Sequence, residues 1–337
     1  MTAPTLRRPG GRRGLLLGAA ALAAWAPGGA RAQAGGADYP SRPATVVNPW
    51  PAGGSSDTLT RILMQRIGAD LGQPFVVENR PGATGTLGTA SVARARPDGY
   101  TLLLGTNSTY GIAPHLTAGG LPYDNERAFA GISLVARSPQ LLCVHPSVPA
   151  RDLQALLALA RAQPDALTFS SAGIGGTSHL ATEMLMSMAR IGLLHVPYRG
   201  GGPAAQALLA GEVKITFIDV VTALPFIAEG RIRALAVSTR TRAPLAPEVP
   251  TIEEAGLEGF ESATDFALMA PAGTPDPVLR RLHAATLAAL RAPEVREKLD
   301  AAGLIVIGGA PEEWPAYLSR EVAKWGAIIR ERNIRAG

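Results

Sequence analysis

Cysteine is almost absent from this sequence, because only one of its 337 residues is a cysteine. The single Cys143 excludes an intramolecular disulfide. Its place in the apolar run 141–144 predicts a buried, unreactive thiol. Because Cys143 lies far from the N-terminus, a lipid-anchored start is not supported either.

Several motifs that mark catalytic or cofactor sites are also missing. The sequence has no P-loop G-K-[ST], and Gly82-x-x-Gly85-x-x-Gly88 lacks the G-x-G start of a dinucleotide fingerprint. No G-x-S-x-G elbow is present, and the five histidines show no metal-ligand spacing. Ser178 and His179 are neighbours in sequence, so on a helix their side chains point apart. We therefore expect no cofactor, no metal and no catalysis.

Acidic residues are absent from residues 1–32, which contain five arginines. A short apolar run at 15–25 follows, and Ala30-Arg31-Ala32 is a small-x-small pattern. This order predicts an export signal peptide at 1–32, cleaved near Ala32 or Ala34. The apolar run is shorter than the roughly 20 residues that a bilayer requires. Arg12-Arg13 resembles a twin-arginine signal, and an ordinary secretory signal remains open.

An excess of charge of either sign is missing once this leader is set aside. The chain has 32 Lys and Arg against 27 Asp and Glu, and removing the five arginines leaves 27 of each. A formally neutral chain of about 305 residues is long enough for two domains. Nothing global indicates nucleic acid or an anionic membrane as a partner.

Strand-like apolar runs alternate with stretches of helical period along the rest of the chain. The run 44–50, for example, precedes an amphipathic stretch at 57–71, and 167–170 precedes 177–190. This alternation predicts an α/β fold with parallel strands. Extended apolar segments near 131–146 and 260–271 predict two crossing strands. The domains expected are 38–137 plus 260–337, and 138–259.

Four glycine-rich turns occupy the strand-to-helix junctions, at 50–57, 79–88, 170–179 and 198–204. Such a turn lets backbone N–H groups converge, and the helix dipole adds positive potential, so it can hold a carboxylate without Lys or Arg. A single turn is explained as well by tight-turn geometry. Of the four turns, the second is the one best explained by backbone geometry alone, because Arg80-Pro81-Gly82 is typical of an ordinary tight turn. The first and third carry more hydroxyls and glycines than a cap needs.

Seven short segments in order resemble the substrate-binding proteins of tripartite tricarboxylate transporters, the Bug family. They are PAGGSSD at 51–57, VENRPGA at 77–83, PDGYTLL at 97–103, LPYD at 121–124, SSAG at 170–173 with SHL at 178–180, HVPYRG at 195–200 and PAGTP at 271–275. The similarity spans nearly the whole mature chain.

The resemblance implies a type II periplasmic-binding-protein fold, whose two domains close on a small organic anion for delivery to the membrane subunits of the transporter. It implies a periplasmic location, and we expect a monomer. The ligand-binding residues expected are Trp50, Ala52, Gly53, Gly54, Ser55, Ser56, Asp57, Asn107, Ser171, Ala172, Gly173, Gly176, Thr177, Ser178, Tyr198, Gly200 and Asp219. Trp50 stands where the family suggests Phe or Tyr, which leaves the ligand's identity open.

Two other functions remain open at this point. An exported hydrolase would use Ser178 or Asp57 in the same cleft. A sensory binding protein would share the fold and feed a signalling system. Asp57 at a helix start is also explained as a cap.

Overall fold

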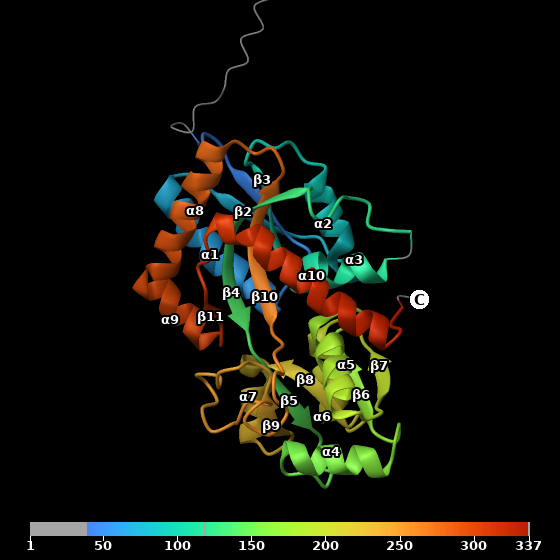
Figure 1. The fold of residues 1–337 in the computed structure, drawn as a ribbon. Helices are drawn as coiled ribbons and strands as arrows, with labels where there is room; N and C mark the ends of the chain where they lie inside the picture. Colours follow the sequence, from blue (N-terminus) through green and yellow to red (C-terminus); the bar gives the residue numbers. More distant parts are fainter. Residues whose placement is uncertain (1–38, 118, 336–337) are drawn as a thin grey trace, which may run out of the picture. The chain divides into compact units, whose positions relative to one another are not determined.

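The computed structural model describes residues 39–117 and 119–335, which form two β-sheets with helices packed around them (Figure 1). The predicted signal peptide lies outside the described residues. A six-stranded sheet has the order β11-β4-β10-β3-β1-β2, and a five-stranded sheet has the order β7-β6-β8-β5-β9. Contacts join Ala34–Gly337 into one unit, so the division at 137/138 and 259/260 stays a prediction.

The first part of the chain and its C-terminal part build the six-stranded sheet. Its elements are β1 (Ala44–Asn48), α1 (Ser55–Leu71), β2 (Phe75–Asn79), η1 (Ala83–Gly85), α2 (Thr86–Ala93), β3 (Thr101–Thr106), η2 (Ser108–Ile112), α3 (Ala113–Leu116), β4 (Phe129–Ser138), β10 (Thr264–Pro271), α8 (Asp276–Arg291), α9 (Pro293–Ala301), β11 (Ile305–Val306), η3 (Pro311–Glu313) and α10 (Trp314–Glu331).

The middle of the chain builds the five-stranded sheet. Its elements are β5 (Gln140–Val144), α4 (Leu153–Ala162), β6 (Thr168–Ser171), α5 (Thr177–Ala189), β7 (Leu194–Pro197), α6 (Gly201–Leu209), β8 (Ile215–Asp219), α7 (Val220–Ala228) and β9 (Arg233–Val237).

Alternation along the strands explains why the six-stranded sheet is covered on both faces. Val46 belongs to a buried cluster with the α1 residues Leu59 and Leu63, whereas Val47 belongs to another with Trp314 of α10. Successive side chains of a strand point to opposite faces, so β1 contributes to both clusters. Helix α1 ends where Gly72 takes a left-handed conformation at φ 71°.

The predicted parallel pairing is correct for part of each sheet and wrong for the strands that join them. β1 pairs in parallel with β2 and β3, and β6 with β7 and β8. β10 is antiparallel to β3 and β4, and β5 is antiparallel to β8 and β9. Only Pro139 separates β4 of the six-stranded sheet from β5 of the five-stranded sheet, so the chain passes directly from one sheet to the other.

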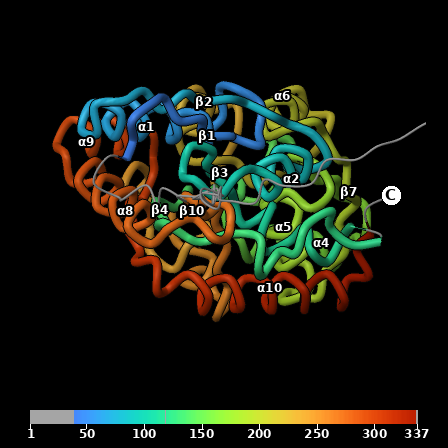
Figure 2. Tube along the Cα trace, turned by 90° about the horizontal axis from the view of Figure 1, so that it is seen from above, coloured from blue at the N-terminus to red at the C-terminus, as the bar shows by residue number. Residues whose placement is uncertain are grey.

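The two expected crossing segments are present, and α10 is a third element that contacts both groups. β4 and β10 lie side by side and lead toward the five-stranded sheet (Figure 1). Helix α10 runs along the side opposite α1 (Figure 2). Its Trp314 packs in the cluster beside β3, whereas its Trp325 and Ile329 pack in the cluster that contains α5. The C-terminal half of α10 therefore supports the second group of elements.

Candidate functional site

The first glycine-rich turn is held by Asp57, which lies in the first turn of α1. The carboxylate of Asp57 accepts hydrogen bonds from Gly53 N at 3.0 Å, from Asn79 Nδ2 at 3.0 Å and from Arg61 Nε at 3.0 Å. Burial opposes the charged form of Asp57, but the bonds from Arg61, Gly53 and Asn79 outweigh it and lower its pKa. Asp57 therefore fixes the turn, which agrees with its explanation as a helix-start residue.

Two further predicted residues of this turn also face the protein. Trp50 Nε1 donates to Thr106 Oγ1 at 3.2 Å, and the buried Ser56 donates from Oγ to Asn48 Oδ1 at 2.8 Å. Ala52, Gly53 and Gly54 are exposed, and Gly54 is the residue before α1. The free groups of this turn are thus the backbone N–H groups at the start of α1, which have no partner inside a helix.

The third turn uses its own side chains to satisfy its backbone. Ala172 N donates to Ser178 Oγ at 3.0 Å, Gly173 N to Ser171 Oγ at 3.2 Å and Gly175 N to His179 Nδ1 at 3.3 Å. Gly176 N donates to Gly173 O at 3.0 Å. The hydroxyls of Ser171 and Ser178 therefore shape this turn, and its remaining donors are the N–H groups of the first turn of α5.

Two stacked histidine rings lie next to the third turn and contact it through Ser171. Ser171 Oγ lies 2.6 Å from His195 Nε2, and the rings of His195 and His179 stack with centroids 4.0 Å apart. His179 in turn lies 3.4 Å from Glu183, which pairs with Arg332 at 2.8 Å. Burial, followed by the neighbouring His179, lowers the pKa of His195 to about 4. His195 is therefore neutral near pH 7, and His179 is a buried residue of α5 that packs against the rings of Phe169 and His195.

The fourth turn lies directly beside the third. Tyr198 N donates to Ser171 O at 3.0 Å, and Gly200 N donates to Ala172 O at 3.2 Å. Gly200 has φ 114°, a conformation that favours glycine. The hydroxyl of Tyr198 lies 3.4 Å from Glu212. The predicted residues Tyr198 and Gly200 thus belong to the same corner as Ser171 and Gly173.

Residues of the two groups of elements meet at these turns. Ser55 Oγ donates to Asp219 Oδ2 at 2.9 Å, and Thr84 Oγ1 donates to the carbonyl of Ile174 at 3.1 Å. Ser108 Oγ lies 3.1 Å from Thr177 Oγ1. The structure therefore joins the start of α1 to the end of β8, the second turn to the third turn, and η2 to the start of α5.

Asn107 is buried at the junction of these elements. Its Nδ2 donates to Ala263 O at 2.9 Å, and its Oδ1 lies 3.5 Å from Thr177 Oγ1 and 3.4 Å from Asp265 N. With both amide atoms engaged, Asn107 connects the crossing segment before β10 to the start of α5. We expect it to position these elements.

Thr84 and Gln140 are two residues of this junction that the sequence analysis did not single out. Thr84 lies in the second turn, and its backbone takes φ 52°, which directs a hydroxyl to the third turn. The feature of the sequence that could have identified Thr84 is a hydroxyl residue between two glycines, shortly after the end of a strand. Gln140 opens β5 opposite Asp219 in the β5–β8 ladder. The feature of the sequence that could have identified Gln140 is a single amide residue directly before the apolar run 141–144.

The two residues considered for a hydrolase, Ser178 and Asp57, are both held by structural hydrogen bonds. Ser178 Oγ accepts from Ala172 N, and Asp57 is held by Arg61 and Asn79. Within residues 39–117 and 119–335, no group of three His, Cys, Asp or Glu could hold a metal ion. Cys143 is buried, as predicted, and burial raises the pKa of its thiol.

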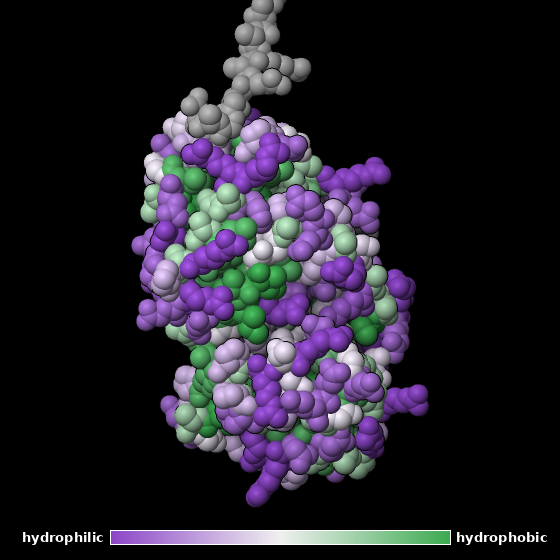
Figure 3. All heavy atoms as spheres, turned by 60° about the vertical axis from the view of Figure 1, so that its left-hand side comes forward, coloured by the Kyte–Doolittle hydropathy of each residue, from purple (hydrophilic) through white to green (hydrophobic). Residues whose placement is uncertain are grey.

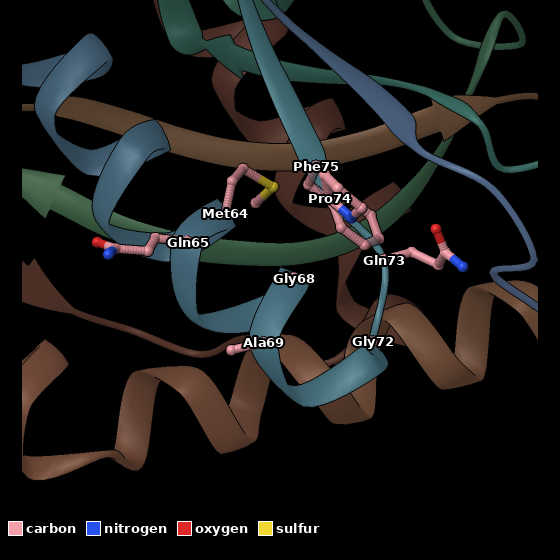
Figure 4. A pocket seen from close by; sticks show the side chains of 8 residues that line it. All are labelled: Met64, Gln65, Gly68, Ala69, Gly72, Gln73, Pro74 and Phe75. Carbon is pink, nitrogen blue, oxygen red and sulfur yellow. The ribbon is translucent and has the colours of Figure 1, made fainter.

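Two surface hollows lie away from these turns. One of about 420 Å³ lies where α1 ends and β2 begins, and its polar side chains are the amides of Gln65 and Gln73 (Figure 4). Another of about 370 Å³ lies by β4 and α10 and includes Trp314 and Arg320. Neither contains a predicted ligand-binding residue, so the candidate site remains the junction of the helix starts.

Comparison with known proteins identifies close relatives of this arrangement. A family model described as tripartite tricarboxylate transporter family receptor matches residues 59–334. A UPF0065 protein from the tcbD-tcbE intergenic region of Pseudomonas sp. strain P51 is 41% identical over 299 residues, covering 88% of each chain. The structure of R. palustris Rpa4515 with adipate has a TM-score of 0.82 at 33% identity, covering 89% of this chain and 100% of that one. MatC from Rhodopseudomonas palustris with bound malate has a TM-score of 0.78 at 35% identity, covering 86% and 100%.

Proposed function

This chain belongs to the tripartite tricarboxylate transporter receptor family, and from that premise we propose that it captures a small carboxylate in the periplasm. It then presents the ligand to the membrane subunits of a transporter of the tripartite tricarboxylate type. The family consists of receptors, which removes the hydrolase alternative.

The observation that carries this proposal is that two helix starts lie among the residues that join the two groups of elements. The first turns of α1 and α5 each offer backbone N–H groups and the positive end of a helix dipole. Ser55 joins the start of α1 to Asp219 at the end of β8, and Ser108 of η2 contacts Thr177 at the start of α5. A carboxylate is the ligand that such an arrangement favours. The adipate and malate bound to the two similar structures are carboxylates too.

The mechanism is a shift between open and closed states of the proposed domains. The contacts Ser55–Asp219 and Thr84–Ile174 join residues of 38–137 to residues of 138–259. A ligand held from both sides stabilises the arrangement in which these contacts form. The transporter then recognises the closed form. This mechanism requires no cofactor.

A thermal-shift screen of the mature chain against a panel of organic acids tests the proposal. A ligand bound only by the folded state at 100 times its Kd adds about 2.7 kcal/mol to the free energy of unfolding. We expect a rise in melting temperature with at least one di- or tricarboxylate and none with its amide or ester. A panel in which no carboxylate raises the melting temperature would contradict the proposal.

Replacing Gly54 with Val tests the role of the α1 start directly. Gly54 has φ −84°, and a Cβ built there meets nothing within 4 Å, so the fold accommodates the larger residue. The side chain then blocks approach to the N–H groups of α1. Losing one charge-assisted hydrogen bond of about 1.5–3 kcal/mol weakens binding roughly ten- to a hundredfold.

Calorimetry measures this effect, and Gly54→Ala serves as the graded control, since one methyl group blocks less than an isopropyl group. The melting temperature of each variant without ligand checks that the fold is kept. Unchanged affinity in Gly54→Val would show that the ligand does not approach the start of α1.

A further inference from the structure

The corner where β5 begins and β8 ends has an unusual set of polar groups. Gln140 of β5 and Asp219 of β8 are directly opposite each other in the antiparallel ladder. Ser55, at the start of α1, donates to Asp219 Oδ2 at 2.9 Å. Asp219 is also the residue before α7, and Val220 N donates to Pro139 O. Elements of both sheets therefore surround this carboxyl group.

Two buried acceptors in this corner have no donor. Among residues 39–117 and 119–335, Asp219 Oδ1 and Gln140 Oε1 make no hydrogen bond and are shielded from solvent. A buried acceptor that stays without a partner destabilises the fold, because it has lost its hydrogen bond to water. A native structure carries few of these, so two on facing positions of one ladder point to a partner that brings donors.

The groups around Asp219 also give it no positive charge. Burial raises the pKa of Asp219, and the neighbouring polar groups of Ser55, Ser138 and Gln140 offset this only in part. No Lys, Arg or His contributes within the described chain. A second carboxylate placed against Asp219 would meet a like charge, whereas a hydroxyl or ammonium group would meet an acceptor.

We propose that Asp219 and Gln140 select ligands that carry a hydroxyl or ammonium group beside a carboxylate. The inference rests on the proposed function and names its ligand class. The carboxylate of the ligand faces the helix starts, and its donor group faces the two acceptors. Substituted acids are then preferred over unsubstituted acids of the same length, because only they satisfy both buried oxygens.

Calorimetry with two matched series of acids tests the selection. The first series is succinate, methylsuccinate, malate and aspartate, and the second is adipate, 2-hydroxyadipate and 2-aminoadipate. In the series whose length fits, we expect a hydroxy or amino acid to bind at least about tenfold more tightly than the unsubstituted acid. Methylsuccinate controls for added size without a donor. The hydroxyl and ammonium members distinguish the two kinds of donor.

Two variants assign the preference to this corner. Asp219→Asn removes the negative charge, and Gln140→Met removes the amide acceptor at similar length. Each is expected to reduce the preference for the substituted over the unsubstituted acid to less than about threefold. Their melting temperatures without ligand report whether the fold is kept.

The outcomes separate this inference from the function on which it rests. Equal binding of substituted and unsubstituted acids, or a preference retained in both variants, would overturn the selection and leave the receptor function standing. Such a result would mean that the Gln140 amide is turned to donate to Asp219, so that the pair satisfies itself. If no acid of either series binds, the proposed function fails first.

Discussion

At the scale of single residues, Asp57 shows how a polar side chain in a predicted binding turn serves the fold. Its carboxylate receives Gly53 N, Asn79 Nδ2 and the Arg61 guanidinium. These donors come from the turn, from β2 and from the next turn of α1. A carboxylate with three donors therefore fixes the exposed backbone of Gly53 and with it the turn that leads into α1.

Asp57→Ala is expected to lower the free energy of unfolding by about 1–3 kcal/mol at neutral pH. Because the pKa of Asp57 is lowered in the folded state, the carboxylate contributes stability above its ordinary pKa. That contribution is lost as the pH falls through the folded-state pKa. Urea unfolding of wild type and variant should therefore show a difference at pH 7 that shrinks in acid.

The matched control is Asp70→Ala on the same helix. Asp70 pairs with Arg66 but is more exposed than Asp57, with side-chain exposures of 28% and 7%. A surface ion pair of this kind contributes little to stability. Equal effects of the two substitutions would show that the buried network around Asp57 has no special role.

At the scale of elements, the crossing strands are tied by Arg137 of β4. Its Nε and Nη2 donate to Asp265 of β10 at 2.6 and 2.9 Å, and its Nη1 donates to Glu261 at 2.8 Å. Tyr317 of α10 donates to Asp265 Oδ2 at 2.8 Å. β4, β10 and α10 are thus joined where the chain passes between the sheets. We expect this network to keep β4, β10 and α10 in fixed positions relative to one another when the proposed domains move.

Arg137→Met leaves Asp265 buried without its cation, and we expect a loss of about 3–5 kcal/mol in the free energy of unfolding. Arg137→Lys keeps the charge but loses the two-pronged geometry, so its effect should be intermediate. Chemical denaturation measures both. Arg240→Met is the control, because the side chain of Arg240 is 62% exposed and its pair with Glu261 is screened by solvent. A Lys variant as stable as wild type would contradict the importance of the paired bonds.

At the scale of the whole molecule, the face drawn in Figure 3 is mostly hydrophilic, with hydrophobic residues gathered in a smaller area. None of the helices in the described residues is both long and apolar enough to cross a membrane.

Export provides a test at this scale. We expect the periplasmic protein to begin at Gln33 or Gly35, after cleavage near Ala32 or Ala34. Intact-mass measurement of the exported chain identifies its first residue, and size-exclusion chromatography with light scattering should give a monomer.

Replacing Arg12 and Arg13 together with Lys should block export if the twin-arginine route is used. Export unaffected by that change would indicate the ordinary secretory route, and an uncleaved N-terminus would contradict the signal.

The sequence predicted most elements because their signals are local. Helix α1 was expected at 57–71 and spans Ser55–Leu71, since Leu59, Leu63 and Ile67 recur at helical spacing. Helix α7 was missed, since Pro225 lies inside it and interrupts the helical signal. The antiparallel strands were missed because pairing direction depends on partners far along the chain. The ligand-binding residues are predicted from residue type, and residue type does not determine the direction in which a hydroxyl group points.

The sequence by itself determined the alternation of elements and the glycine-rich turns, and it predicted the leader and the family, because propensities, periodicity and short motifs act over a few residues. Tertiary structure alone decided that Ser56 donates to Asn48 of β1, that Ser178 accepts from Ala172 of its own turn and that Ser55 reaches Asp219, 164 positions away. A hydrogen bond between distant residues forms only after packing has brought their elements together. No local pattern can carry that information.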